Sequence, residues 1–334
     1  MTTILEMKDK MIHFYGKNEV YMKPIIKFFV AIALFLTINF NIGYMERISS
    51  VPVALILALL CSVIPTNGMI VLATLVILAD MYALSLEVCL VALLLFAVVY
   101  FLYFRFAPKN GYDVLLIPIC FKLNIPYVMP VGMGLLRGAY SVFALISGCV
   151  VYFFLHGVKE NAAVLSGAAE AEEEAGSKIV IALNQLMDNK EMYLVVGVMV
   201  ATTIIVYMIR RMSIENAWRV AIFSGILFQT IGLIAGYMLL GISDKMIGVL
   251  VGNVISGVIA LVIQFLFFNL DYSRTERLQF EDDEYYYYVK AVPKSFISGK
   301  DKQVKRFGGK EEKEERITKK QLAREMDIDE DLLD

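Results

Sequence analysis

Residues 88–104 read VCLVALLLFAVVYFLYF, an apolar run with no charged side chain. A helix needs about 20 such residues to cross the hydrocarbon core of a bilayer. Seven other apolar runs lie along the chain, two of them short for that length, so the sequence predicts a bundle of about eight spans. The predicted spans are residues 25–44, 51–64, 68–83, 88–104, 139–155, 193–209, 220–240 and 246–268.

The composition supports lipid as the solvent of this region. The 334 residues are 58% hydrophobic with a mean hydropathy of +0.65, and 19% are charged, against about 25% in soluble domains. Of the 64 charged residues, 31 fall in residues 271–334. We therefore predict an all-α polytopic membrane protein with an N-terminal arm (residues 1–24), a transmembrane domain (25–270) and a polar tail (271–334).

A ninth apolar stretch, residues 114–136, reads VLLIPICFKLNIPYVMPVGMGLL. Its three prolines each remove a backbone donor and disturb the preceding turn. A straight helix facing lipid would then leave carbonyls unpaired in hydrocarbon. The pattern favours two half-helices, either re-entrant or interfacial, and a kinked full span is the alternative.

The distribution of Lys and Arg predicts the orientation. With the N-terminus inside and the interrupted stretch not crossing, the inner segments before the tail hold 12 basic residues and the outer segments hold 5. The positive-inside rule then places both termini in the cytoplasm. The long loop at 157–192 is predicted outside, as a plain connection that includes a short surface helix; a lid over an outer cavity is the alternative.

Charged groups inside spans are costly and mark candidate functional positions. Asp80 and Glu87 flank one turn, either in headgroup water or as an acid pair that binds a cation or proton. Lys122 and Arg137 either snorkel to the inner interface or hold an anionic group with interrupted helix ends. We also consider Gln229, Asn253 and Gln264 for a substrate or ion pathway, although such amides more often bond between helices.

Four glycines in the last two spans have small-residue spacing, at Gly232 and Gly236 and at Gly248 and Gly252. This spacing lets helices approach closely, which predicts tight packing and leaves a homodimer possible.

Several kinds of chemistry leave no pattern in the sequence. The four cysteines and two histidines have no metal-ligand spacing, so no metal or other cofactor is predicted. No catalytic constellation or nucleotide-binding loop is recognisable, so an enzyme is not predicted. A net charge of −2 without a one-sided basic patch argues against nucleic acid.

The tail begins DYSRTERLQFEDDEYYYYVKAVPK. Its tyrosines, at positions 285–288, favour a short strand on a partner-binding surface, and a solvated arm is the alternative. The partner-binding tyrosines are Tyr285, Tyr286, Tyr287 and Tyr288. This segment, with the stretch IRRMSIENAWRVAI and the proline-rich run, resembles a group of uncharacterised, loosely permease-like multi-pass proteins of clostridial Gram-positive bacteria. The resemblance implies a bacterial plasma membrane.

These observations predict a transporter or permease type of membrane protein. The alternative is a scaffold without transport activity that recruits cytoplasmic partners through residues 271–334. The two readings differ in where polar span residues point. A shared cavity lined by Asp80, Lys122, Asn253 and Gln264 would favour transport, and a scatter over helix interfaces would favour the scaffold.

Overall fold

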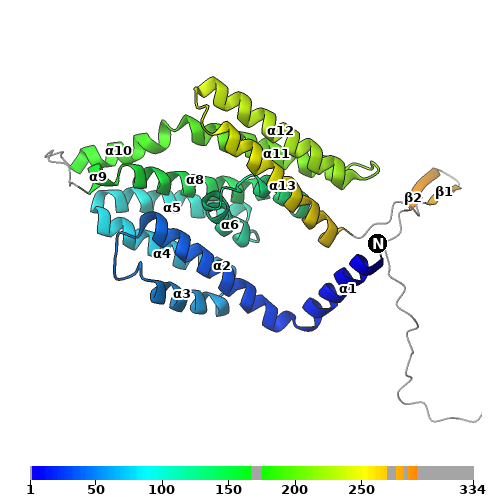
Figure 1. The fold of residues 1–334 in the computed structure, drawn as a ribbon, viewed down its shortest axis with the longest axis horizontal. Coiled ribbons are helices and arrows are strands. Elements are labelled where there is room, and N and C mark those ends of the chain that lie inside the picture. The colour runs from blue at the N-terminus through cyan, green and yellow to red at the C-terminus, as the bar shows by residue number, and fades with distance from the viewer. Residues whose placement is uncertain (1, 167–174, 269–275, 282–284, 292–334) are drawn as a thin grey trace, which may run out of the picture. The chain divides into compact units, whose positions relative to one another are not determined.

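A computed structural model describes residues 2–166, 175–268, 276–281 and 285–291. These residues form a helix bundle and one small β-hairpin (Figure 1). The helices are α1 (Thr2–Lys17), α2 (Glu19–Ile42), α3 (Val51–Val63), α4 (Thr66–Leu84), α5 (Leu86–Phe106), α6 (Gly111–Lys122), α7 (Val128–Leu136), α8 (Ser141–Glu160), α9 (Ala162–Leu165), α10 (Ala175–Met187), α11 (Lys190–Arg211), α12 (Ala217–Leu240) and α13 (Met246–Phe267).

Seven helical segments among the described residues are long and apolar enough to cross a membrane, and they include α2, α4, α5, α8, α11, α12 and α13. This confirms the predicted all-α polytopic bundle. Helix α3 has 13 residues, or about 20 Å. It still returns the chain along α2, because the Ser62 hydroxyl donates to the Pro24 carbonyl at 3.1 Å and Lys27 donates to the Ile64 carbonyl at 3.0 Å.

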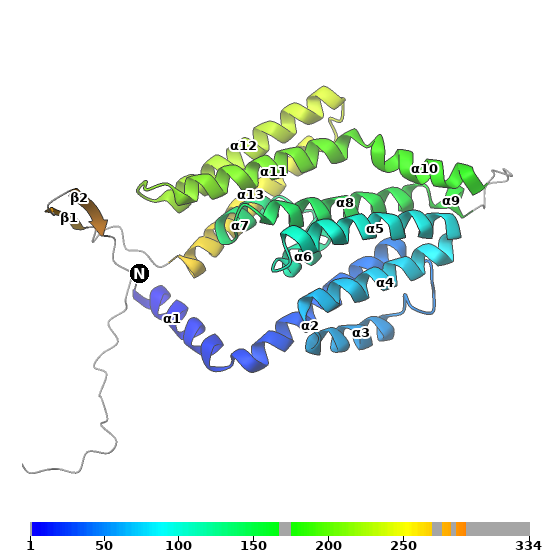
Figure 2. The same cartoon turned by 180° about the vertical axis from the view of Figure 1, so that it is seen from behind.

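Helix α8 lies between the group α2 to α5 and the group α11 to α13 in both views (Figures 1 and 2). Large side chains such as Phe35, Leu145 and Met199 are fully buried there. By contrast, Phe101 and Leu239 are 76% and 88% exposed on the outside. Apolar faces of this kind suit contact with lipid, so the chain is a multi-pass membrane protein.

The predicted loop at 157–192 contains the short helix α10. Its Ala182 is buried, and Gln185 donates a hydrogen bond to the Gly157 carbonyl of α8. The short surface helix expected here is therefore present. The acidic residues 167–174 lie outside the described residues.

The hairpin pairs β1 (Glu276–Glu281) with β2 (Tyr286–Ala291) in antiparallel register, with Glu281 opposite Tyr286. The strand expected at the tyrosines thus occupies most of that run. Tyr285, Tyr286 and Tyr287 are exposed, and the side chain of Tyr288 lies outside the described ones. The rest of the tail, residues 292–334, also lies outside them.

Candidate functional site: a polar cavity at the tip of a helical hairpin

The interrupted stretch forms two short helices, α6 and α7, joined by residues 123–127. Asn124 takes a left-handed backbone conformation with φ of 57°, which asparagine tolerates better than most residues. The turn closes the end of α6, because the Ile125 amide donates to the Cys120 carbonyl at 2.9 Å. Backbone groups at the break are thus paired within the protein, as hydrocarbon surroundings require.

The positions of the three prolines differ from what we expected. Only Pro118 lies beyond the first turn of a helix, in α6. Pro126 precedes α7, and Pro130 is the third residue of α7. First-turn amides have no partner in a helix, so Pro130 removes no helical hydrogen bond there.

Both ends of this hairpin lie together. The Arg137 Nε lies 3.2 Å from Asp113 Oδ2, which joins the end of α7 to the first turn of α6. Arg210 of α11 also donates to the Leu135 carbonyl. A stretch whose two ends meet does not cross the bundle once, so the element is a hairpin of half-helices and not a kinked full span.

The tip of the hairpin is held by α12 and α13. A Cβ on Gly252 would meet the Tyr127 ring at 2.5 Å, so the ring occupies the space above this glycine. The buried Gln229 donates to the Tyr127 carbonyl at 3.5 Å. Gly252 and the Gln229 side chain therefore position the turn between α6 and α7.

A polar cavity of about 270 Å³ borders the tip. Its main charged pair is Glu191 of α11 with Lys245, which precedes α13; Lys245 Nζ lies 2.6 and 2.7 Å from the two carboxylate oxygens. The Tyr237 hydroxyl also donates to Glu191 at 3.2 Å. The lining residues are Phe121, Asn124, Pro126, Tyr127, Tyr152, Phe153, His156, Glu191, Val195, Tyr237, Lys245 and Gly248.

A second cavity of about 70 Å³ lies among α2, α4, α5, α6 and α8 and is almost wholly apolar. Tyr152 and His156 of α8 line both cavities. Their rings stack with centroids 5.7 Å apart, and Phe121 stacks on Tyr152 at 4.1 Å. Tyr152 and His156 therefore belong to the walls of both cavities.

Asp80 and Glu87 do not share a site. Asp80 is fully buried and not in headgroup water; its Oδ1 accepts from the Met45 amide at 2.9 Å and the Ser49 hydroxyl at 3.2 Å. It thereby holds the loop between α2 and α3. Burial raises the pKa of Tyr44 in that loop, and the Asp80 carboxylate adds to the rise. Glu87 instead accepts from Ser85.

Lys122 and Arg137 are also apart. Lys122 ends α6 near the tip and donates to Asn41 Oδ1 at 3.3 Å. Arg137 is at the other end of the hairpin with Asp113. These two residues therefore do not form a joint anion site with each other, which was one of the two alternatives.

The pathway amides divide as well. Gln229 contacts the tip, as described above, whereas the Asn253 side chain donates to the Val249 carbonyl of its own helix at 3.0 Å. Gln264 has a buried oxygen without a hydrogen-bond partner. None of Asp80, Lys122, Asn253 and Gln264 lines either of these two cavities.

Three of the four glycines meet neighbouring elements. Gly232 and Gly236 of α12 face Val198 and Leu194 of α11, and Gly252 faces the hairpin tip. Gly248 departs from the packing prediction, because no atom lies within 4 Å of the Cβ it lacks. It lines the polar cavity instead.

Sequence reasoning did not select the residues that make the polar cavity. Glu191 and Lys245 stand at span ends, where charges are ordinary, and no local pattern marks Tyr152 or Tyr237. The usable signal was Tyr127, since it stands inside the interrupted stretch between two prolines. Among the described residues no cluster of three or more His, Cys, Asp or Glu is placed to hold a metal ion.

The fold and site together define a multi-pass membrane helix bundle with a hairpin of two short helices and a polar cavity at its tip. No protein-family model matches the chain, and no curated protein or solved structure matches it either.

Proposed function

We propose that this chain is a permease-like transporter of a bacterial plasma membrane, without enzymatic activity, that binds its substrate in the polar cavity. The supporting observation is that the hairpin tip supplies three lining residues, Asn124, Pro126 and Tyr127. Irregular backbone at membrane depth persists where protein or a water-filled cavity satisfies it. Broken helices in secondary transporters form substrate sites in this way.

The cavity opens outward in this proposal. It is lined by the C-terminal parts of α8 and α12 and by residues at the N-terminal ends of α11 and α13. The excess of Lys and Arg at the other ends favours the cytoplasm there. Lys8 of α1 donates to the Phe268 carbonyl at 3.0 Å, which agrees with an N-terminus and a tail on one side.

The test uses two glycines with open space beside them. Gly248→Cys lines the cavity, whereas Gly197→Cys lies exposed on α11 outside it. Both are made in full-length protein whose four cysteines are replaced by serine. A charged, membrane-impermeant thiol reagent should label Gly248→Cys in whole cells and leave Gly197→Cys unlabelled. Equal labelling, or none at position 248, would contradict an outward aqueous site.

The β1–β2 hairpin supports a second candidate function, a scaffold that recruits cytoplasmic partners. Tyr285 and Tyr286 are 62% and 68% exposed, and exposed tyrosines are frequent in protein interfaces. The full chain carrying Tyr285→Ser and Tyr286→Ser should lose any partner that crosslinks to the unmodified chain in cells. An unchanged crosslinking pattern would count against these tyrosines as a docking surface.

A further inference from the structure

We propose that the two cavities form one site for an amphiphile, with a hydrocarbon chain in the apolar cavity and a zwitterionic head group in the polar cavity. This inference rests on the proposed transport function and names its substrate class. It starts from the shared walls: Tyr152 and His156 line both spaces. A ligand that passes these rings would meet an apolar surface on one side and charged groups on the other.

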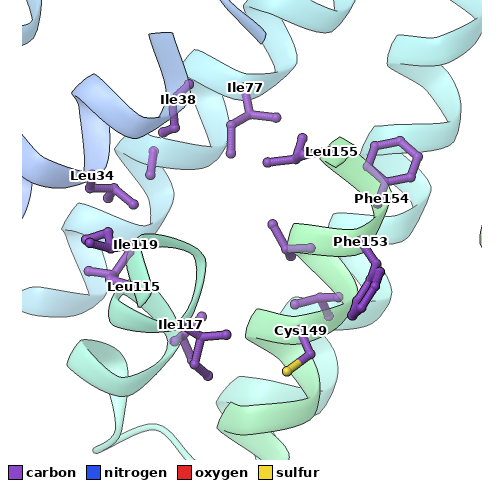
Figure 3. Packing of buried hydrophobic residues seen from close by; sticks show 14 of the residues in the cluster. Leu34, Ile38, Ile77, Leu115, Ile117, Ile119, Cys149, Phe153, Phe154 and Leu155 are labelled. Atoms are coloured by element: carbon purple, nitrogen blue, oxygen red, sulfur yellow. The ribbon is translucent and has the colours of Figure 1, made fainter. Parts of the chain in front are cut away.

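The apolar cavity, or slot, is lined by aliphatic side chains of α2, α4 and α8. Leu34, Ile38 and Ile77 lie on one side of it and Leu155 on the other (Figure 3). All four side chains are buried. Internal apolar cavities stay dry and accept apolar guests, so water is not the expected occupant.

Hydroxyl groups along the slot are already used. The Thr37 and Thr74 hydroxyls donate to carbonyls one turn back in their own helices, at 2.7 and 2.9 Å. Tyr100 donates to Thr74 at 2.6 Å, and Tyr103 donates to Asn67 at 2.9 Å. These hydroxyl groups already donate their hydrogen bonds within the protein. A hydrocarbon chain is therefore the ligand group that suits the slot.

The polar end carries one anion and one cation. The Glu191 side chain is 22% exposed and the Lys245 side chain 50%, so the carboxylate is the more fixed partner. A ligand ammonium that takes the place of Lys245 on Glu191 would leave Lys245 without its counterion. A ligand that also brings an anionic group restores that pairing, and a zwitterionic head group carries both charges.

The tyrosine hydroxyls add to this selection. Tyr237 is 3% exposed and already donates to Glu191, which fixes the carboxylate. Tyr127 and Tyr152 line the same cavity as Glu191. Three tyrosines in one cavity suit the several oxygen atoms of a phosphodiester or carboxylate head group.

The experiment measures binding of myristoyl lysophosphatidylethanolamine to the purified full chain by native mass spectrometry in a nonionic detergent. We expect one saturable ligand. Ala73→Leu fills the slot, since Ala73 lines it, and should weaken binding roughly tenfold. Ala235→Leu is the matched control on the exposed face of α12 and should bind like the unmodified chain.

A second pair of variants tests the head group. Glu191→Gln should weaken lysophosphatidylethanolamine roughly tenfold, and Glu46→Gln, an exposed change in the loop after α2, should not. Glycerophosphoethanolamine, which lacks the chain, should bind Ala73→Leu and the unmodified chain equally. If the melting profile of Ala73→Leu shows that this variant is not folded, Ala73→Val is used instead, because its side chain is smaller.

Two results would overturn the inference. Unchanged lysophosphatidylethanolamine affinity in a folded slot variant would exclude the slot as the chain site. Equal binding of monomyristoylglycerol, unaffected by Glu191→Gln, would exclude a zwitterionic head group. Either result with Gly248→Cys still labelled from outside would leave the transport proposal standing, whereas an unlabelled Gly248→Cys would contradict that proposal itself.

Discussion

Two pairs of consecutive helices in this bundle differ in helix length and in the turn that joins them. Helices α4 and α5 have 19 and 21 residues and are joined at Ser85 alone, so each spans about 30 Å. Helices α6 and α7 have 12 and 9 residues, about 18 and 14 Å. The first pair is long enough to carry its turn, the surface turn, across the hydrocarbon core. The second pair is too short for that, so we infer that its turn, the deep turn, ends within the core.

This difference changes what each turn needs. The surface turn exposes Tyr82 and Leu86, 63% and 58% accessible. The deep turn is held by Gly252, Gln229 and its own left-handed Asn124. A break at membrane depth must be supported by neighbouring helices, and the support shapes the adjoining cavity. The predictions below test how strongly the deep turn depends on these contacts.

The largest effect is expected at Gly252. In Gly252→Leu the new side chain enters the space of the Tyr127 ring, and overpacking of this kind costs about 1–3 kcal/mol. Gly248→Leu on the same helix is the control, because it meets open space. The melting temperature of the detergent-extracted full chain should fall clearly for Gly252→Leu and only slightly for Gly248→Leu. Equal melting temperatures would mean that the tip does not depend on this glycine.

The ends of the two pairs give the second test. The Asp113 side chain is 11% exposed beside Arg137 at 38%, so Arg137→Gln should cost about 2 kcal/mol, between the values for exposed and buried ion pairs. Adding Asp113→Asn should recover most of that loss. In the longer pair, Tyr103→Phe removes the hydrogen bond to Asn67 and should cost about 1 kcal/mol. A larger loss for Tyr103→Phe than for Arg137→Gln would reverse the comparison.

A smaller effect is expected at Asn124. Asn124→Ala places a Cβ in the left-handed region without a side chain that can bond locally, which costs about 1 kcal/mol. Asn124→Gly should melt close to the unmodified chain, since glycine adopts this conformation freely. If the alanine variant also melts unchanged, the turn is not held in the left-handed conformation.

The sequence was sufficient for the bundle and for the interruption at residues 114–136. Long apolar runs form α-helices in lipid. The three prolines and two glycines of residues 114–136 rule out a straight span there. It was not sufficient for the contacts of the break. Asp113 pairs with Arg137, 24 positions away, and Tyr127 meets Gly252, 125 positions away. No local period encodes such pairs.

The same reason explains which site residues were missed. Asp80 reads as a functional carboxylate because acids inside spans are costly, yet its partners are a loop amide and a hydroxyl. Glu191 and Lys245 read as ordinary span-end charges, and the fold brings them together at 2.6 Å. The chemistry of a single residue was visible in the sequence, and its partner was not.

The smallest effect is expected at Pro130, and it tests whether prolines alone make the deep turn. Pro130 is in the first turn of α7, where an amide would have no helical partner. Pro130→Ala should therefore change stability by less than about 0.5 kcal/mol.

Removal of Pro118, Pro126 and Pro130 together leaves Asn124 and the Asp113–Arg137 pair in place. We expect the hairpin to persist, so a cysteine at Ser166 in a chain without native cysteines should keep its labelling side in whole cells. A switch of side in the triple variant would show that the prolines prevent a continuous span, and that the ion pair and the left-handed turn only follow from them.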